Sequence, residues 1–344
     1  MGIFSYCGLK LEYGRRRGIY TPPSTISNYF IPAGEPLLNI AGQVYIHARV
    51  FCSKMAQTKI AVAEVERFFE SSGERIFWFS DLAAIFGRYR HAWNLPKAVT
   101  SATFVDWLLS KTKLVKVKLS SGEYPEIVRY GWGDAPSPVR MGLSAKRKSY
   151  LSHASALWVH GIGGSPRELF VNHEQGEKPA NDGSLTQEAI HRAFRNQPRH
   201  SKLIYRMNGN TITIVNGKHT GRLGVEQAVS PNGDLVDVTS LERTLIDVAV
   251  RPNYGGGVIQ VLKGFTSAQG RVSVRKMAHL LKTLDYTYPY HQAIGFYLMR
   301  SGYPSRNQRL FSAMGINLDF YLSHGLVNPV RDPEWRIFYP RELD

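Results

Sequence analysis

The chain has 344 residues, 43% of them hydrophobic, which is enough apolar material for two separate cores. Its 43 Lys and Arg residues outnumber 27 Asp and Glu residues, so the formal net charge is +16 and a polyanionic partner is favoured. The two cysteines, Cys7 and Cys52, exclude a disulfide framework and a zinc site made of cysteines. No apolar run approaches the roughly 18 to 20 residues that span a bilayer. We therefore expect a cytoplasmic protein of two domains; a merely basic globular protein is the alternative.

Residues 1–55 are predicted to be an N-terminal extension. Their apolar run from Leu37 to Val50 has no clear helical period. The segment MAQTKIAVAEVERFFESSG, which begins at Met55, is typical of the start of a bacterial regulatory protein. We therefore expect that Met55 is the native start and that residues 1–54 are not part of the native product.

Three amphipathic helices are predicted after the extension. The first has apolar residues at helical spacing from Val62 to Phe69 and ends at Ser71–Gly73. The second has Ser80 as its expected N-cap. Its inward residues are expected to be Leu82, Ala83, Ile85 and Phe86. The third begins at Asn94–Lys97. Its inward residues are expected to be Ala98, Ala102, Val105, Leu108 and Leu109.

A basic hairpin is predicted to follow the helices. Residues 114–119 alternate, with Lys116 and Lys118 on one face of a strand and Val115 and Val117 on the other. Residues 120–123 supply a turn, and residues 127–130 form the return strand. Three helices followed by such a hairpin predict a winged helix-turn-helix domain over residues 56–142, joined to the next domain by residues 131–137.

A winged helix of this kind binds duplex DNA through its third helix and its hairpin. We expect Lys97, Thr100, Ser101 and Thr103 near the bases. The residues expected near phosphates are Lys111, Lys113, Lys116, Lys118 and Arg129. The alternative is a winged helix that docks a protein and exposes these lysines to solvent. The link Arg88–Asn94 is longer than the usual turn of about 3 to 4 residues.

A mixed α/β domain is predicted over residues 143–344. Helices are expected at 150–160, 240–250, 274–284 and 291–301, and the 240–250 helix has Thr239 and Glu242 at capping-box spacing. Residues 211–215 are expected to be a strand of a hairpin whose turn is Asn216–Gly217. The whole chain is therefore predicted to have an α+β fold.

Candidate catalytic and metal sites in this domain have simpler interpretations. His153 and His160 share a helix face, but no third ligand is spaced to join them. Arg243 and Asp247 are an i,i+4 pair, and Glu242 fits the cap. No P-loop, nucleophile-elbow or zinc-protease motif is present. We therefore expect neither enzymatic activity nor a cofactor; a nuclease or other enzyme remains an alternative for this domain.

Several segments resemble the AbiEi family, the antitoxins of type IV, AbiE-type toxin-antitoxin systems. They are YLSHASALWVHGI at 150–162, VTSLERTLIDVAVRPNYGGG at 238–257 and HQAIGFYLMRSG at 291–302, and FYLSHG and WRIFYP near the end. The resemblance covers roughly residues 55–340. It implies an N-terminal winged helix that represses the protein's own operon by binding operator DNA. It also implies a C-terminal antitoxin domain that counteracts a nucleotidyltransferase-like toxin without a stable complex. The long link and residues 1–54 depart from the family pattern. The alternative is a stand-alone regulator whose C-terminal domain binds a ligand or partner.

Overall fold

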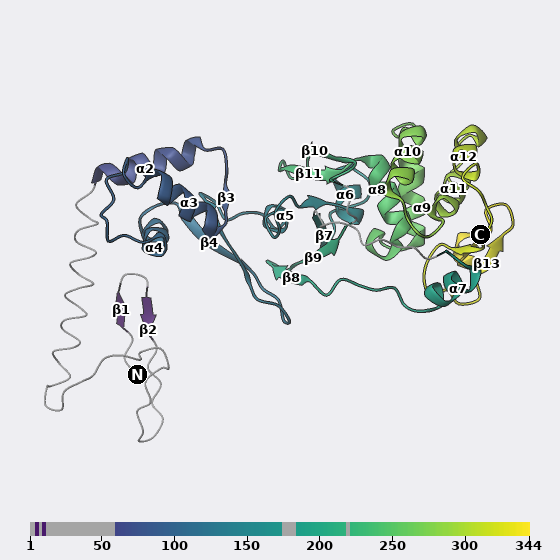
Figure 1. Ribbon diagram of the computed structural model, residues 1–344, viewed down its shortest axis with the longest axis horizontal. Coiled ribbons are helices and arrows are strands. Elements are labelled where there is room, and N and C mark those ends of the chain that lie inside the picture. Colours follow the sequence, from purple (N-terminus) through teal and green to yellow (C-terminus); the bar gives the residue numbers. More distant parts are fainter. Residues whose placement is uncertain (1–3, 7–8, 12–58, 174–183, 218–220) are drawn as a thin grey trace, which may run out of the picture. The chain divides into compact units, whose positions relative to one another are not determined.

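The computed structural model describes residues 4–6, 9–11, 59–173, 184–217 and 221–344 (Figure 1). The chain has an α+β fold and divides into two compact units. The first comprises the residues up to Lys116 with Tyr130–Ala135, and the second comprises Val117–Arg129 with Pro136–Asp344. Within the extension, β1 (Phe4–Tyr6) pairs with β2 (Leu9–Leu11). The rest of the extension, including the expected start at Met55, lies outside the described residues.

The described residues of the first unit include three helices and strands of a small sheet. The helices are α2 (Lys59–Ser71), α3 (Phe79–Tyr89) and α4 (Ser101–Lys111). The strands β3 (Ile76–Phe77), β4 (Leu114–Leu119) and β5 (Ile127–Trp132) form a sheet in the order β3-β5-β4. The core is largely aromatic: Phe69 stacks on Trp132 at 4.7 Å between ring centroids, and Phe104 packs on Phe86 at 5.2 Å. The predicted helices and hairpin strands are therefore present.

Two details of the predicted helices are wrong. The N-cap of α3 is Trp78 rather than Ser80, and the Asp81 carboxylate accepts from the Trp78 backbone N–H at 2.9 Å. In α4 the inward face consists of Phe104, Val105, Trp107 and Leu108, whereas Ala98 and Ala102 are exposed. The helix turns its largest rings inward because they remove the most apolar surface from water.

The long link between α3 and α4 is itself packed. Trp93, Leu95 and Val99 are buried, and the Leu95 backbone N–H donates to the Arg90 carbonyl at 2.9 Å. The Arg90 side chain also donates to the Lys97 carbonyl at 3.2 Å. The additional residues therefore form part of the core and fix where α4 begins.

The outer half of the hairpin belongs to the second unit. Leu119 is fully buried in a cluster with Val139, Met141 and Ile212. Ser120 pairs with Arg206 through two backbone hydrogen bonds of 3.1 and 2.8 Å. The second compact unit therefore includes residues 117–129 and continues from Pro136, whereas the predicted domain boundary is at 142/143.

A six-stranded sheet forms the first half of the second unit. Its strands are β6 (Tyr150–Leu151), β7 (Glu168–His173), β8 (Ile204–Met207), β9 (Asn210–Asn216), β10 (Val225–Val229) and β11 (Leu235–Thr239). Their order is β10-β11-β6-β7-β9-β8, with parallel pairing of β6 with β11 and of β7 with β9. The helix α5 (Pro138–Leu143) precedes β6, α6 (His153–Val159) connects β6 to β7, and α7 (Gln187–Arg195) lies between β7 and β8.

The predicted hairpin turn at Asn216–Gly217 is wrong. The strand β9 pairs with the preceding β8, and Asn208 and Gly209 form the turn between them. Both residues have positive φ, 49° and 75°, as a type I′ turn requires. Gly217 instead lies against Asn172 of β7, since a Cβ at Gly217 would meet the Asn172 amide. Two Asn-Gly pairs flank the same strand, and only the tertiary pairing selects the first as the turn.

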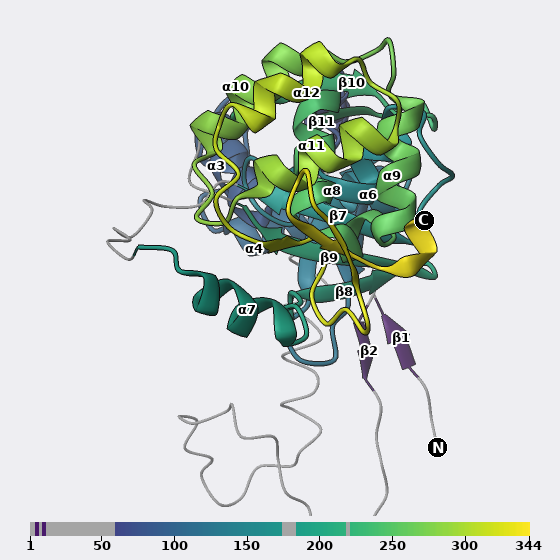
Figure 2. The ribbon, with the colours of Figure 1, turned by 90° about the vertical axis from the view of Figure 1, so that its right-hand side faces the viewer.

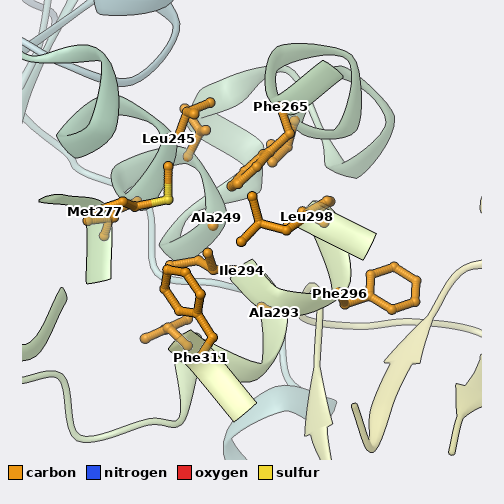
Figure 3. Close-up of a cluster of buried hydrophobic side chains, with 14 of the residues drawn as sticks. Leu245, Ala249, Phe265, Met277, Ala293, Ile294, Phe296, Leu298 and Phe311 are labelled. Carbon is orange, nitrogen blue, oxygen red and sulfur yellow. The ribbon is translucent and has the colours of Figure 1, made fainter. Parts of the chain in front are cut away.

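A helical subdomain completes the second unit. It contains α8 (Leu241–Val250), η1 (Pro252–Gly255), α9 (Val258–Ser267), α10 (Val274–Leu284), α11 (Tyr290–Arg300) and α12 (Ser305–Ser312). The helices α9, α10 and α11 pack against α8, and α12 packs against α10 and α11 (Figure 2). Leu245, Phe265, Met277, Ile294 and Phe311 meet in its core (Figure 3). The predicted helices at 240–250, 274–284 and 291–301 agree with the structure to within one residue at each end.

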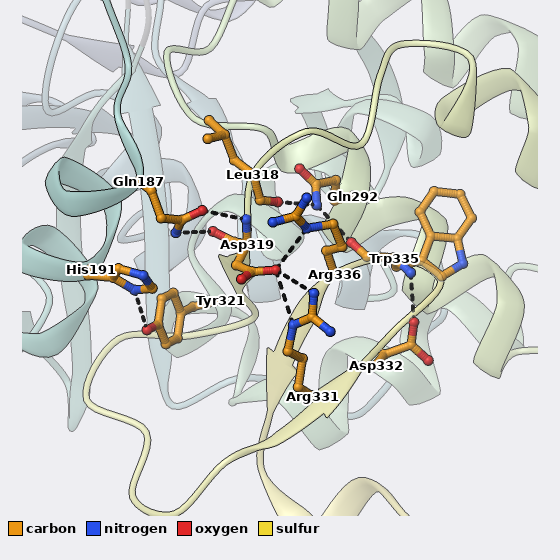
Figure 4. Close-up of polar contacts among 10 residues, drawn as sticks. All are labelled: Gln187, His191, Gln292, Leu318, Asp319, Tyr321, Arg331, Asp332, Trp335 and Arg336. Carbon is orange, nitrogen blue, oxygen red and sulfur yellow. Dashed lines mark hydrogen bonds and ion pairs between the residues drawn. The ribbon is translucent and has the colours of Figure 1, made fainter.

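A small three-stranded sheet holds the C-terminal segment against this subdomain. Its strands are β12 (Phe320–Tyr321), β13 (Val330–Asp332) and β14 (Ile337–Tyr339), followed by η2 (Arg341–Leu343). Figure 4 shows Asp319 accepting from Arg331 and Arg336, each at 2.8 Å, and Gln187 of α7 bonded to the Asp319 backbone. Burial would raise the pKa of Asp319, but the two arginine hydrogen bonds outweigh it and hold the pKa below its ordinary value.

Candidate functional site

The start of α4 carries the predicted base-contacting residues. Lys97 is exposed just before the helix and has no ion-pair partner among the described residues. Thr100 is the N-cap of α4, and its hydroxyl accepts from the Thr103 backbone N–H at 3.2 Å. The Thr103 hydroxyl accepts from the Thr100 N–H at 2.9 Å. These two hydroxyls therefore stabilise the helix start, while Ser101 is half-buried and its hydroxyl makes no hydrogen bond with the described residues.

The lysines around β4 fall into two groups. Lys113 pairs with Glu70 and Lys118 pairs with Glu126, each at 2.6 Å. The hydrogen bond from Glu70 raises the pKa of Lys113 above its ordinary value. Lys111 and Lys116 are exposed and have no acidic partner in the described part of the chain. A paired lysine offers less net positive charge to a phosphate than a free one, so Lys111 and Lys116 are the stronger candidates.

Arg129 does not belong to the exposed basic surface. Only 6% of the residue is exposed, and its guanidinium donates to the carbonyls of Ser144 at 2.8 Å and Ala145 at 3.0 Å. Its predicted contact with phosphate is therefore corrected. Arg129 fastens the return strand to the segment after α5, and five guanidinium donors suit this task better than a lysine ammonium would.

Sequence reasoning overlooked two cations close to α4. Arg88 is exposed at the end of α3, and its guanidinium lies 5.7 Å from the Tyr89 ring centroid. Arg90 lies over the Phe86 ring at 5.1 Å and donates to the link carbonyls. The sequence could have indicated both residues, because they belong to the basic link 88–94 that leads into the predicted DNA-contacting helix.

A second group of polar residues lines a depression in the second unit. Arg243, Asp247 and Arg251 follow one another at four-residue spacing, so they lie along one face of α8. The Arg243 guanidinium donates to Asp247 Oδ1 at 2.8 Å, and the side chains are only 2% and 4% exposed. The other carboxylate oxygen of Asp247, Oδ2, is buried and has no hydrogen-bond partner among the described residues. Burial raises the pKa of Asp247, while the charge of Arg243 opposes this.

His153 lies beside this pair in an uncommon backbone conformation. Its φ is 53°, in the left-handed region that residues other than glycine rarely adopt. Its Nδ1 is 2.8 Å from the Ser152 hydroxyl, and its ring packs edge-on against Tyr254 at 5.3 Å. Burial, together with the charges of Arg251 and Arg243, lowers the pKa of His153 well below its ordinary value. A neutral, strained histidine therefore faces the cationic end of α8.

The capping box predicted for Thr239 and Glu242 is wrong. The cap of α8 is Ser240, whose hydroxyl accepts from the Arg243 backbone N–H. The Glu242 carboxylate instead accepts from the Ser273 N–H at 3.1 Å and pairs with Lys276 at 2.9 Å. His160 Nε2 donates to the Thr239 carbonyl at 2.7 Å. Among the described residues, no group of three or more His, Cys, Asp or Glu side chains is arranged to hold a metal ion.

Comparison with known proteins gives a likeness of fold. No family model and no curated protein matches the chain. The crystal structure of the RV2827C protein from Mycobacterium tuberculosis is similar to it, with a TM-score of 0.50 and 12% sequence identity. The match covers 82% of this chain and 92% of that chain. In the described ranges of the present chain, no helix has the length and apolar composition needed to cross a bilayer.

Proposed function

We propose that the chain is a cytoplasmic, non-enzymatic antitoxin and autorepressor that binds operator DNA through a winged helix within residues 56–142. The single observation that carries the DNA-binding part is the set of exposed lysines around α4 that have no acidic partner among the described residues. These are Lys97, Lys111 and Lys116. The order of α2, β3, α3, α4, β4 and β5, with the sheet β3-β5-β4, supports the winged helix.

The antitoxin part of this proposal is supported by the family resemblance described above. Its motif VTSLERTLIDVAVRP forms β11's end, α8 and the start of η1, where Arg243, Asp247 and Arg251 line the depression. The motif that resembles the AbiEi family therefore contributes polar residues to the depression as well as apolar residues to the core of the second unit. We expect this unit to counteract a nucleotidyltransferase-like toxin encoded beside the antitoxin.

The DNA-binding part is tested by the salt dependence of binding to the duplex upstream of the gene. Each neutralised phosphate contributes about 0.9 to the slope of log K against log salt concentration. We expect Lys116→Ala to weaken binding to every duplex and to lower the slope by about 0.9. Lys113→Ala is the matched control, since Lys113 is already paired with Glu70. Equal slopes for the wild type and Lys116→Ala would remove β4 from the interface.

The antitoxin part is tested by co-expression with the neighbouring gene. A triple variant with alanine at 97, 111 and 116 should lose operator binding and still rescue growth from the toxin. Loss of rescue by this folded variant would show that the two activities are not separable. If the wild-type chain gives no rescue and no toxin-like gene lies beside it, a stand-alone regulator is the better description, and the depression in the second unit favours a ligand as its signal.

A further inference from the structure

The depression in the second unit has the size and the boundaries of a small-molecule site. Two cavities, of about 280 and 500 Å³, share Val250, Arg251, Tyr288 and Tyr290 in their walls. They are therefore two parts of one depression, formed at the C-terminal end of α8, where η1 and the loop before α11 meet. Sites for small ligands commonly have volumes of about 300 to 1,000 Å³.

One carboxylate oxygen in this depression has no hydrogen-bond donor among the described residues. Within the described part of the chain, Asp247 Oδ2 is buried without a hydrogen-bond partner, although Arg243 donates to Oδ1. A buried carboxylate oxygen left in this state costs free energy. A hydroxyl or an amine on a ligand would supply the missing hydrogen bond.

The other charged groups of the depression are cationic. Arg251 and Arg199 are exposed at its walls, with His200 and His324 near them. No acidic side chain other than Asp247 is among the described residues of either cavity. Arg251 also lies at the C-terminal end of α8, and its guanidinium packs on Tyr254 at 5.6 Å, which holds it at the opening. The depression therefore favours a ligand with an anionic group at one end.

Aromatic rings line the space between the cations and Asp247. Tyr254 packs against Phe170 at 4.8 Å between centroids, and Tyr290 is buried and packs edge-on against Phe320 at 5.2 Å. Tyr288 is half-buried and belongs to both cavities. Rings held in place by such neighbours offer flat apolar surfaces on which a planar group can stack at little entropic cost.

An anionic group, a planar ring and a hydroxyl or amine donor are the three features of a nucleotide. We propose that this depression binds a single free nucleoside monophosphate. The phosphate lies against Arg251 and Arg199, the base stacks among the tyrosines, and a ribose hydroxyl or an exocyclic amine donates to Asp247. The site is independent of the proposed DNA surface, because no residue of α4 or β4 lines either cavity.

The proposal is tested by calorimetric titration of the full-length protein with AMP and GMP. Ribose 5-phosphate and inorganic phosphate test the phosphate alone, adenosine tests the base and ribose, and the dinucleotide pApA tests the end of a strand. We expect saturable binding of one mononucleotide per chain. Ribose 5-phosphate, inorganic phosphate and adenosine should each bind at least about tenfold more weakly.

Arg251→Gln and Arg199→Gln should each weaken mononucleotide binding by about tenfold, the effect of losing one charge-assisted contact. Arg275→Gln is the matched control, because Arg275 is an exposed arginine of α10 that lines neither cavity. Asp247→Asn should weaken mononucleotide and adenosine binding alike, and circular dichroism verifies that this variant is folded. The arginine variants keep the test decisive even if Asp247→Asn unfolds.

Four results would overturn the proposal, and the first three concern the mononucleotide site itself. They are the absence of saturable mononucleotide binding, binding of inorganic phosphate as tight as that of the nucleotide, and an equal loss in Arg275→Gln. Binding of pApA without binding of AMP or GMP would also overturn it, since the site would then recognise a strand. None of these results depends on whether the first unit binds DNA, so the two proposals fail separately.

Discussion

Gly295 of α11 has no room for a side chain, because the ring of the buried Trp335 lies directly against it. A Cβ at Gly295 would overlap the indole, whereas a Cβ at Gly264 of α9 would make ordinary contacts, the nearest of them 3.7 Å from Leu157. The absence of a side chain at position 295 therefore allows Trp335, which lies between β13 and β14, to pack directly against α11. Both glycines lie in helices and are followed by phenylalanine, but only Gly295 lies where a side chain would clash.

Alanine substitution distinguishes these two glycines. We expect Gly295→Ala to lower the free energy of unfolding by about 3 kcal/mol or more, because the core must shift around a large rigid ring. Gly264→Ala should instead raise it by up to about 1 kcal/mol through higher helix propensity. Urea denaturation followed by circular dichroism measures both. Equal effects of the two substitutions would contradict this packing.

His153 should make the stability of the protein depend on pH. Its folded-state pKa lies well below the ordinary value, so the unfolded chain binds a proton that the folded chain does not. Stability attributable to His153 is therefore fully present above about pH 6.5 and is lost progressively as the pH falls below it. The full slope for one such proton is about 1.4 kcal/mol per pH unit.

We expect His153→Gln to reduce this slope between about pH 6 and 5. His291 and His324 also have lowered pKa values, through burial, and they contribute to the wild-type slope. Their contribution remains in the variant, so the difference between the two curves isolates His153. Urea unfolding at several pH values gives the curves, and parallel curves would show that His153 does not titrate differently on folding.

At the scale of the element, Thr100 and Thr103, both predicted to lie near DNA bases, cap the N-terminus of α4. The reciprocal hydrogen bonds between Thr100 and Thr103 form a capping box with two threonines. A capping hydroxyl contributes about 1 kcal/mol to stability. Ser101, the next residue, makes no such contact with the described residues.

The two positions should therefore respond differently to alanine. Thr100→Ala should lower the free energy of unfolding by about 1 kcal/mol, whereas Ser101→Ala should leave it within about 0.5 kcal/mol of the wild type. Ser101→Ala should weaken operator binding if its hydroxyl reaches the DNA. Thermal unfolding and fluorescence anisotropy measure the two properties, and a larger loss of stability at Ser101 than at Thr100 would contradict the assignment of the cap.

The hairpin of β4 and β5 is divided between two packing environments. Leu114 is buried in the first unit, and Leu119, five residues further along the same strand, is buried in the second. Lys116 and Lys118 alternate with the half-buried Val115 and Val117, as the strand period requires. The alternation follows from the sequence alone. The core in which Leu119 is buried, however, is formed by residues more than 20 positions away, such as Met141 and Ile212.

At the scale of the whole molecule, this shared hairpin decides which fragments can fold. A fragment of residues 145–344 would lack Leu119, Val139 and Met141, which cover the sheet residues Val171 and Ile212. We expect this fragment to unfold at a lower temperature and with less cooperativity than residues 55–344, and to bind a hydrophobic dye. Differential scanning calorimetry compares the two. Identical, sharp transitions would show that the second unit does not need the hairpin.

The sequence by itself determined the helices and strands whose hydrophobic period is strong. It located α2 and α3, the alternating strand β4 and the helices α8, α10 and α11, because their apolar residues recur at 3.6 or 2 positions. It also identified the Arg243–Asp247 pair from its four-residue spacing. The exposure of Lys97, Lys111 and Lys116 follows from the same periodicity and basic composition.

The tertiary structure alone decided which of these residues remain available for function. It buried Arg129 against two carbonyls, gave Lys113 and Lys118 acidic partners, and chose Asn208–Gly209 rather than Asn216–Gly217 as the turn. It also brought His153, Arg251 and the tyrosines together around Asp247, from segments about 100 residues apart in the chain. Periodicity reports how one segment meets a core, whereas ion pairs, strand partners and pockets depend on which distant segments meet, and no local pattern encodes that.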